Sequence, residues 1–184
     1  VNDFKIACYG SIVLKEDGKA YAAGKNSYGQ LGIGNTTNTS TLTQISIDTN
    51  SKIKYIAPGG DTSAVMTSDG TVYETGYNYY GVLSNGTTTN SNEFVQVKDS
   101  TGKGYLTDII EIAANNCMTY ALKSDGTVYS WGYNYYGNLG QGYGDNSAHT
   151  IPQKVQKVSN IIQISSGENY LAMLDADGSV WSVG

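Results

Sequence analysis

The side chains that could carry out chemistry in this sequence are few, and their spacing does not assemble a familiar catalytic group. A single histidine, His149, lies in the polar stretch DNSAHTIPQ, four residues after Asp145. A Ser-His-Asp triad would also need a serine exposed on a strained turn, and no G-x-S-x-G elbow is present. One imidazole without a nearby cysteine pair does not indicate a zinc site of the usual kind. We therefore expect a solvated loop histidine, no metal, no cofactor and no enzymatic activity.

Acidic side chains recur at regular intervals, but in a context that predicts turns rather than catalysis. Each of four Asp-Gly pairs lies between short apolar runs, which is a strong hairpin signal because both residues tolerate positive φ. Carboxylates used in turns are not available as the pair that glycoside hydrolysis needs. The four pairs begin at Asp17, Asp69, Asp125 and Asp177.

The elements around these turns form a unit that is repeated along the chain. A strand-like run precedes each hairpin, at 4–8, 52–58, 108–114 and 160–166. A glycine-rich loop and a weaker β-prone run follow three of them, at 41–47, 93–98 and 153–158. No stretch shows helical periodicity. Four strands in a repeat with tight hairpins predict a β-propeller blade rather than a solenoid rung.

The length of 184 residues holds about three and a half such units. We expect one all-β domain, 1–184, that forms a partial β-propeller of four-stranded antiparallel blades. An open half-ring would leave unpaired strand edges, which proteins normally avoid. Either the chain is part of a longer propeller, which we favour, or two copies associate to close the ring. The predicted repeats are 4–47, 53–97, 109–158 and an incomplete 161–184.

The glycine-rich loops GKNSYGQLGIG, GYNYYGVLSNG and GYNYYGNLGQG are so alike that a structural role is expected for their shared positions. Glycine permits sharp backbone turns, asparagine hydrogen-bonds the local backbone, and leucine fills the gap between blades. These positions are Gly24, Asn26, Gly29 and Leu31 in the first loop, Gly76, Asn78, Gly81 and Leu83 in the second, and Gly132, Asn134, Gly137 and Leu139 in the third.

Taken together, the strand, hairpin and loop motifs resemble the regulator of chromosome condensation repeat family. The family pattern is roughly I-x-x-I-A-x-G, then A-L-x-x-D-G-x-V-x-x-W-G, then N-x-x-G-Q-L-G, and 121–132 matches its second part most closely. The resemblance implies a β-propeller, usually seven-bladed. It also implies candidate roles in nucleotide exchange on a small GTPase and in enzyme inhibition by one propeller face. The histidine common in the family before the A-L strand is absent, with Thr62, Met118 and Tyr170 in its place.

Charge and composition limit the partners that we expect. A net charge of −5, without any cluster of Lys or Arg, argues against nucleic acid and against anionic membranes. No run of 18 apolar residues is present, so membrane insertion is not expected. The wealth of Thr, Asn, Ser, Tyr and Gly looks like that of bacterial secreted or surface proteins with these repeats. We therefore expect an extracellular or cell-surface location.

The two cysteines, Cys8 and Cys117, lie far apart in the sequence. We expect two small buried thiols, with a disulfide between them as the open alternative.

Two groups of loop residues are candidates for binding. Tyrosines among small polar residues are typical of adaptable protein-binding surfaces, although half of them would serve equally well packed between blades. The loops between the first two strands of each unit would ring the central channel of a propeller and vary from unit to unit. The candidates are Tyr28, Tyr79, Tyr80, Tyr135 and Tyr136 in the first group, and Asp61, Thr62, Met118, Glu168 and Asn169 in the second.

These features predict a non-enzymatic scaffold for protein interaction or adhesion. The main alternative is a lectin-like propeller in which tyrosines stack on the sugar rings of a glycan. Inhibition of an enzyme is also compatible with the sequence, whereas nucleotide exchange with chromatin docking is disfavoured by the acidic balance.

Overall fold

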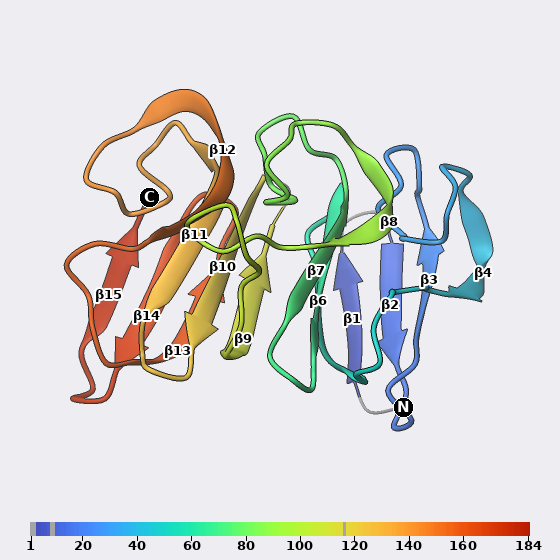
Figure 1. Ribbon diagram of the computed structural model, residues 1–184, viewed down its shortest axis with the longest axis horizontal. Helices are drawn as coiled ribbons and strands as arrows, with labels where there is room; N and C mark the ends of the chain where they lie inside the picture. Colours follow the sequence, from blue (N-terminus) through green and yellow to red (C-terminus); the bar gives the residue numbers. More distant parts are fainter. Residues whose placement is uncertain (1–2, 8–9, 116) are drawn as a thin grey trace.

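The computed structural model of the protein describes residues 3–7, 10–115 and 117–184, and within them it contains strands and loops but no helix. The strands form four antiparallel sheets that lie side by side (Figure 1). The first sheet holds β1 (Asp3–Ala7), β2 (Gly10–Leu14), β3 (Ala20–Gly24) and β4 (Thr39–Gln44). The second holds β5 (Ile53–Pro58), β6 (Thr62–Thr67), β7 (Val72–Gly76) and β8 (Ser91–Gln96).

The third and fourth sheets repeat this plan toward the C-terminus. The third consists of β9 (Ile109–Ala114), β10 (Met118–Lys123), β11 (Val128–Asn134) and β12 (Asp145–Lys154). The fourth has three strands, β13 (Ile161–Ser166), β14 (Leu171–Asp175) and β15 (Val180–Val183). The predicted all-β class is confirmed. No helix long and apolar enough to cross a membrane occurs in the part of the chain that the structure describes.

Each sheet is a meander in which strands pair in chain order. The first strands contact one another from sheet to sheet, β1 with β5, β5 with β9 and β9 with β13. They therefore lie innermost, and the fourth strands lie outermost, as in propeller blades. The loops after the first and third strands emerge at one end, which we call the loop face, and the Asp-Gly hairpins lie at the other (Figure 1).

The Asp-Gly hairpins are closed by the aspartate side chain in three sheets. Asp17, Asp69 and Asp125 each accept a hydrogen bond from the backbone N–H two residues later. In the fourth sheet the acceptor is instead Asp175, whose carboxylate takes the N–H groups of Asp177 and Ser179 at 3.0 and 2.8 Å. Each of these carboxylates binds the backbone of its own turn, which explains why they do not converge in one site.

Apolar side chains fill the gaps between neighbouring sheets in three clusters. Leu31, from the loop of the first sheet, packs with Ile56 and Val65 of the second. Leu139, from the loop of the third, packs with Ile164 and Leu171 of the fourth. Leu31 therefore joins the first sheet to the second, and Leu139 joins the third to the fourth.

Candidate binding surface on the loop face

Seven tyrosines from three successive loops form a continuous row of contacting rings on the loop face. We call this row the tyrosine strip. The ring of Tyr28 lies 5.0 Å from that of Tyr77, and the ring of Tyr80 lies 4.7 Å from that of Tyr133, so the strip crosses both junctions between the first three sheets. The strip consists of Tyr28, Tyr77, Tyr79, Tyr80, Tyr133, Tyr135 and Tyr136.

Three rings of the strip are open to solvent. Tyr79, Tyr135 and Tyr136 are 65%, 50% and 60% exposed, while the other four are partly buried. All five tyrosines predicted for binding belong to the strip. Tyr77 and Tyr133 were missed by sequence reasoning, although they occupy matching positions in the two GYNYYG loops.

Two hydroxyl groups of the strip, those of Tyr77 and Tyr133, have a raised pKa. Burial, followed by the neighbouring Tyr80, raises the pKa of Tyr77 above its ordinary value. Desolvation, followed by the neighbouring Tyr136, likewise raises the pKa of Tyr133. A row of phenol side chains offers apolar contact area together with hydrogen bonds.

The loops that carry the strip are held by buried asparagines. Asn78 is fully buried, and its side chain donates to the carbonyl oxygens of Thr87 and Thr89, both at 3.0 Å, while it accepts the N–H of Leu83 at 2.9 Å. Asn134 accepts the N–H of Leu139 in the same way. Because these bonds satisfy the loop backbone from within, the tyrosines project from a rigid base.

The loops after the first strands are tied together across three sheets. Thr62 Oγ1 donates to the carbonyl oxygen of Asn115 at 3.1 Å, and Asn115 Nδ2 donates to the carbonyl oxygen of Gly167 at 3.1 Å. Asp61 accepts hydrogen bonds from Lys25 Nζ at 3.0 Å and from Gln30 Nε2 at 3.2 Å. These contacts make the inner rim of the loop face a connected network.

Two of the residues predicted for this rim are not at the surface. Thr62 and Met118 are 3% and 1% exposed, because each begins the second strand of its sheet and packs inward. Their expected role as contact residues on a surface is corrected by this burial. Glu168 and Asn169 are exposed, and Asp61 is partly exposed.

A small cavity brings four of the predicted residues together between the third and fourth sheets. Its volume is about 170 Å³, and we call it the loop-face cavity. Tyr80 and Tyr133 of the strip border it, and so does Glu168. The lining residues are Tyr80, Asn115, Cys117, Met118, Tyr133, Glu168 and Asn169.

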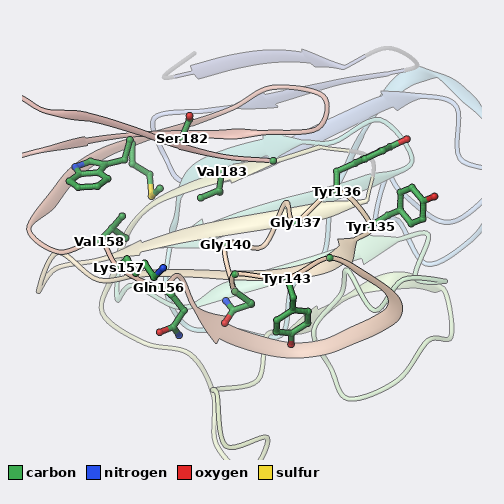
Figure 2. A pocket seen from close by; sticks show the side chains of 16 residues that line it. Tyr135, Tyr136, Gly137, Gly140, Tyr143, Gln156, Lys157, Val158, Ser182 and Val183 are labelled. Carbon is green, nitrogen blue, oxygen red and sulfur yellow. The ribbon is translucent and has the colours of Figure 1, made fainter.

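A larger hollow of about 1120 Å³ lies beside the fourth sheet (Figure 2). In this view Tyr135 and Tyr136 lie at one end of it, Val158 and Lys157 lie at the other, and Val183 of β15 lies between them. At the corresponding position of the second loop, Gly81 lies against Thr150, so β12, the outer strand of the third sheet, occupies the space beside that loop. Gly137, the counterpart of Gly81, faces this hollow. The hollow thus corresponds in position to the place of an outer strand, rather than to a ligand pocket.

The histidine is buried, contrary to the sequence-based expectation. His149 is 8% exposed, and its Nε2 lies 2.9 Å from Asp145 Oδ1. The prediction of a solvated loop was wrong because β12 extends from Asp145 over ten residues and pairs His149 with Gly132 of β11. Among the described residues, no group of three His, Cys, Asp or Glu side chains is placed to hold a metal ion.

The thiol of Cys117 is half-buried and free. Burial, followed by the charge of Asp61, raises the pKa of this thiol. Cys8, the other cysteine, lies outside the described residues.

Comparison with known protein families agrees with this architecture. The regulator of chromosome condensation (RCC1) repeat matches residues 17–66 and 125–174, and a second pattern for the same repeat matches residues 109–138. The chain belongs to the RCC1 repeat family. It is 31% identical over 184 residues to the ultraviolet-B receptor UVR8 of Arabidopsis thaliana, covering 98% of this chain and 40% of that protein. It is also 31% identical to the human E3 ubiquitin-protein ligase HERC2, over 95% of this chain and 4% of that protein.

Solved structures of RCC1-like proteins confirm the β-propeller fold. The chain superposes on human WBSCR16 with a TM-score of 0.85 and 22% identity, over 98% of this chain and 46% of that one. For Prp20p of Saccharomyces cerevisiae the TM-score is 0.80, with 18% identity, over 93% and 42% of the two chains. The chain therefore spans less than half the length of these RCC1-repeat relatives.

Proposed function

We propose that this RCC1-repeat chain is a non-enzymatic scaffold that docks a protein partner on its loop face. The observation that carries the proposal is the tyrosine strip, a row of seven contacting rings of which three are at least half exposed. Tyrosine supplies a large contact area at a low cost in side-chain entropy, and it is enriched where binding energy concentrates in protein interfaces.

The support of the strip favours a protein partner. Its loops are braced by the buried Asn78 and Asn134, so little flexibility is lost when a partner binds. The relative Prp20p has been described together with its binding properties to Gsp1p and histones, and also bound to Kap60. Those partners are proteins, which agrees with the kind of partner proposed for this chain.

The proposal is tested by replacing the three exposed rings. The triple variant Tyr79→Ala, Tyr135→Ala and Tyr136→Ala is compared with Tyr105→Ala, which removes a tyrosine that is 50% exposed but lies outside the strip. Affinity capture from the source organism, followed by titration of the purified partner, should give a discrete partner for the wild type and for the control. Loss of affinity of at least tenfold in the triple variant is expected. A partner that binds the triple variant with wild-type affinity would contradict the proposal.

Glycan binding is the alternative from another class, because exposed rings such as Tyr79 also suit stacking against sugars. A glycan binder should show saturable tyrosine fluorescence changes with a defined oligosaccharide, and those changes should vanish in the triple variant.

Three further expectations remain predictions. They are an extracellular or cell-surface location, a bacterial origin, and closure of a ring, either by self-association or by further blades of a seven-bladed propeller. Size-exclusion chromatography with light scattering decides whether copies of the chain associate.

Nucleotide exchange is a second candidate, supported by one relative. The chain is 32% identical over 166 residues to the secretion-regulating guanine nucleotide exchange factor of Bos taurus, covering 89% of this chain and 35% of that protein. An exchange factor should accelerate the release of labelled GDP from a small GTPase. A scaffold that only docks its partner, or that inhibits an enzyme through one face, should leave that release unchanged.

A further inference from the structure

We propose that the loop-face cavity is a socket for one arginine side chain of the protein partner. The inference rests on the proposed function and specifies the chemistry of the contact. The cavity lies where Tyr80 and Tyr133 of the strip approach the exposed loop that carries Glu168. A partner lying along the strip would therefore pass over its opening.

The dimensions of the cavity suit a single side chain. Its volume of about 170 Å³ is well below the roughly 300–1,000 Å³ of pockets that enclose drug-sized ligands. The lining includes Tyr80 and Tyr133, whose ring centroids lie 4.7 Å apart at an interplanar angle of 62°. The buried Met118 and the half-buried Cys117 add apolar lining. A flat group at the end of an aliphatic stem fits such a space.

The charge of the lining selects a cation. Among the seven lining residues, Glu168 is the carboxylate, and neither lysine nor arginine is present. Cys117 does not compete for the cation, because burial and Asp61 raise the pKa of its thiol and keep it neutral. A guanidinium group stacks on aromatic rings and pairs with a carboxylate through parallel hydrogen bonds, whereas an ammonium group is more strongly hydrated.

The same chemistry already operates once within this protein. At the junction of the first two sheets, Lys25 Nζ lies 5.3 Å from the centre of the Tyr28 ring and 3.0 Å from Asp61 Oδ1. A cation is thus held between a ring of the tyrosine strip and a carboxylate of an inner loop. The loop-face cavity is also lined by a ring of the tyrosine strip, Tyr133, and by a carboxylate of an inner loop, Glu168.

The loop that carries Glu168 is fixed on both sides. Asn115 Nδ2 donates to the carbonyl oxygen of Gly167, and Asn138 Nδ2 donates to that of Asn169. Asn115 Oδ1 in turn accepts the N–H groups of Cys117 and Met118 at 3.1 and 3.0 Å, which positions these two lining residues. A preformed socket loses little entropy on binding.

The test uses the methionine methyl groups as reporters in the intact chain. Met118 borders the cavity, whereas Met66 is buried between the second and third sheets and serves as an internal reference. The protein is labelled with ¹³C at the methionine methyls and titrated with N-acetyl-arginine-N-methylamide. A saturable shift of the Met118 signal is expected, with a Kd on the order of 1 mM for a single side chain. The citrulline analogue, which has nearly the same shape but no charge, should cause no saturable shift.

Variants assign the effect to the proposed contacts. Glu168→Gln should weaken arginine binding at least fivefold, and Tyr133→Leu should weaken it by a similar factor. Glu93→Gln, which removes an exposed carboxylate on β8 outside the cavity, is the matched control and should bind arginine like the wild type. Unchanged Met66 signals show that each variant is folded. Equal shifts with citrulline, or wild-type affinity in Glu168→Gln, would overturn the socket.

The socket and the proposed function fail in different ways. If Glu168→Gln leaves arginine and partner binding unchanged while the strip variant loses the partner, the socket is wrong and the scaffold function stands. If arginine binds in the cavity but no protein partner depends on the strip, the scaffold function is wrong. A double-mutant cycle tests the contact directly. Affinity should fall when Glu168→Gln is made in this chain and when the partner's own arginine is replaced. If it falls no further when both changes are combined, the two residues are in contact.

Discussion

Trp131 Nε1 on β11 lies 3.0 Å from Glu74 Oε2 on β7, so the third sheet donates a hydrogen bond to a carboxyl group of the second. The indole is fully buried, Glu74 is 1% exposed, and the same N–H lies 2.7 Å from the carbonyl oxygen of Val82. Burial raises the pKa of Glu74 from 4.5 to about 8, only partly offset by Thr119 and Trp131. At neutral pH this carboxyl is therefore mostly protonated and fills the junction as a neutral group.

The raised pKa of Glu74 predicts a pH-dependent stability. Because the folded state holds this proton more tightly than the unfolded state, the free energy of unfolding should fall as pH rises from about 4.5 to about 8. Glu74→Gln, which stays neutral, should match the wild type near pH 4.5 and exceed it at pH 8 by roughly 3–5 kcal/mol. Urea unfolding at a series of pH values measures the difference. A constant difference across this range would show that Glu74 does not titrate as described.

The hydrogen bonds with which Asn78 holds the second loop predict that its replacement lowers the free energy of unfolding strongly. Asn78→Ala removes two donated bonds and leaves the N–H of Leu83 without its acceptor, so a loss of about 2–4 kcal/mol in unfolding free energy is expected. Asn50→Ala, at an exposed position in the connection between β4 and β5, should change the unfolding free energy by less than about 0.5 kcal/mol. Equal effects in chemical denaturation would mean that the buried bonds of Asn78 contribute little.

The exposed rings of the tyrosine strip should matter for binding more than for folding. Tyr79→Ala or Tyr136→Ala removes two ring contacts at the surface and should cost about 1 kcal/mol or less. Tyr120→Phe is a useful contrast, because its buried hydroxyl donates to the carbonyl oxygen of Asn138 at 3.1 Å and its loss should leave partner binding intact. Thermal unfolding and partner titration of the same samples separate the two effects. A sharp loss of stability in the surface variants would assign those rings to the core.

The features predicted well from the sequence depend on residues close together in the chain. The Asp-Gly hairpins and the asparagine-braced loops repeat local motifs, so their spacing alone indicates four units. The features that were missed depend on contacts between distant segments. Glu74 looks like an ordinary surface carboxylate until β11 places Trp131 over it, 57 residues later in the chain. The burial of His149 likewise follows from the irregular pairing of β12 with β11 around Gly132.

The binding role of the candidate residues stays a prediction, but their positions in the fold could be anticipated to different degrees for the same physical reason. The tyrosines repeat with the blade, so sequence spacing places them in one row. The surroundings of Thr62 and Met118 are set by packing between sheets, and this buries side chains that the loop motif alone placed at the surface. The loop-face cavity could not be predicted, because it combines residues of the second, third and fourth sheets.

A pair of equivalent glycines provides a test of how the outer strands pack. Gly81 and Gly137 have φ values of 78° and 77°, so alanine at either site carries a similar left-handed backbone strain of about 1–2 kcal/mol. The spaces around them differ. A Cβ at Gly81 would lie 2.9 Å from the backbone nitrogen of Thr150 on β12, whereas at Gly137 the nearest atom is the carbonyl oxygen of Tyr143 at 3.8 Å.

Gly81→Ala should therefore be more destabilising than Gly137→Ala by at least about 1 kcal/mol, because only the first change forces β12 away from its neighbour. Urea unfolding of the two variants measures the difference, and the shared backbone strain cancels in the comparison. Should a longer form of the protein place a strand over Gly137, the two substitutions would become equally costly in that form. Equal losses in this chain of 184 residues would instead mean that the space beside Gly137 is already filled, by a second copy or by rearrangement of the loop around Tyr143.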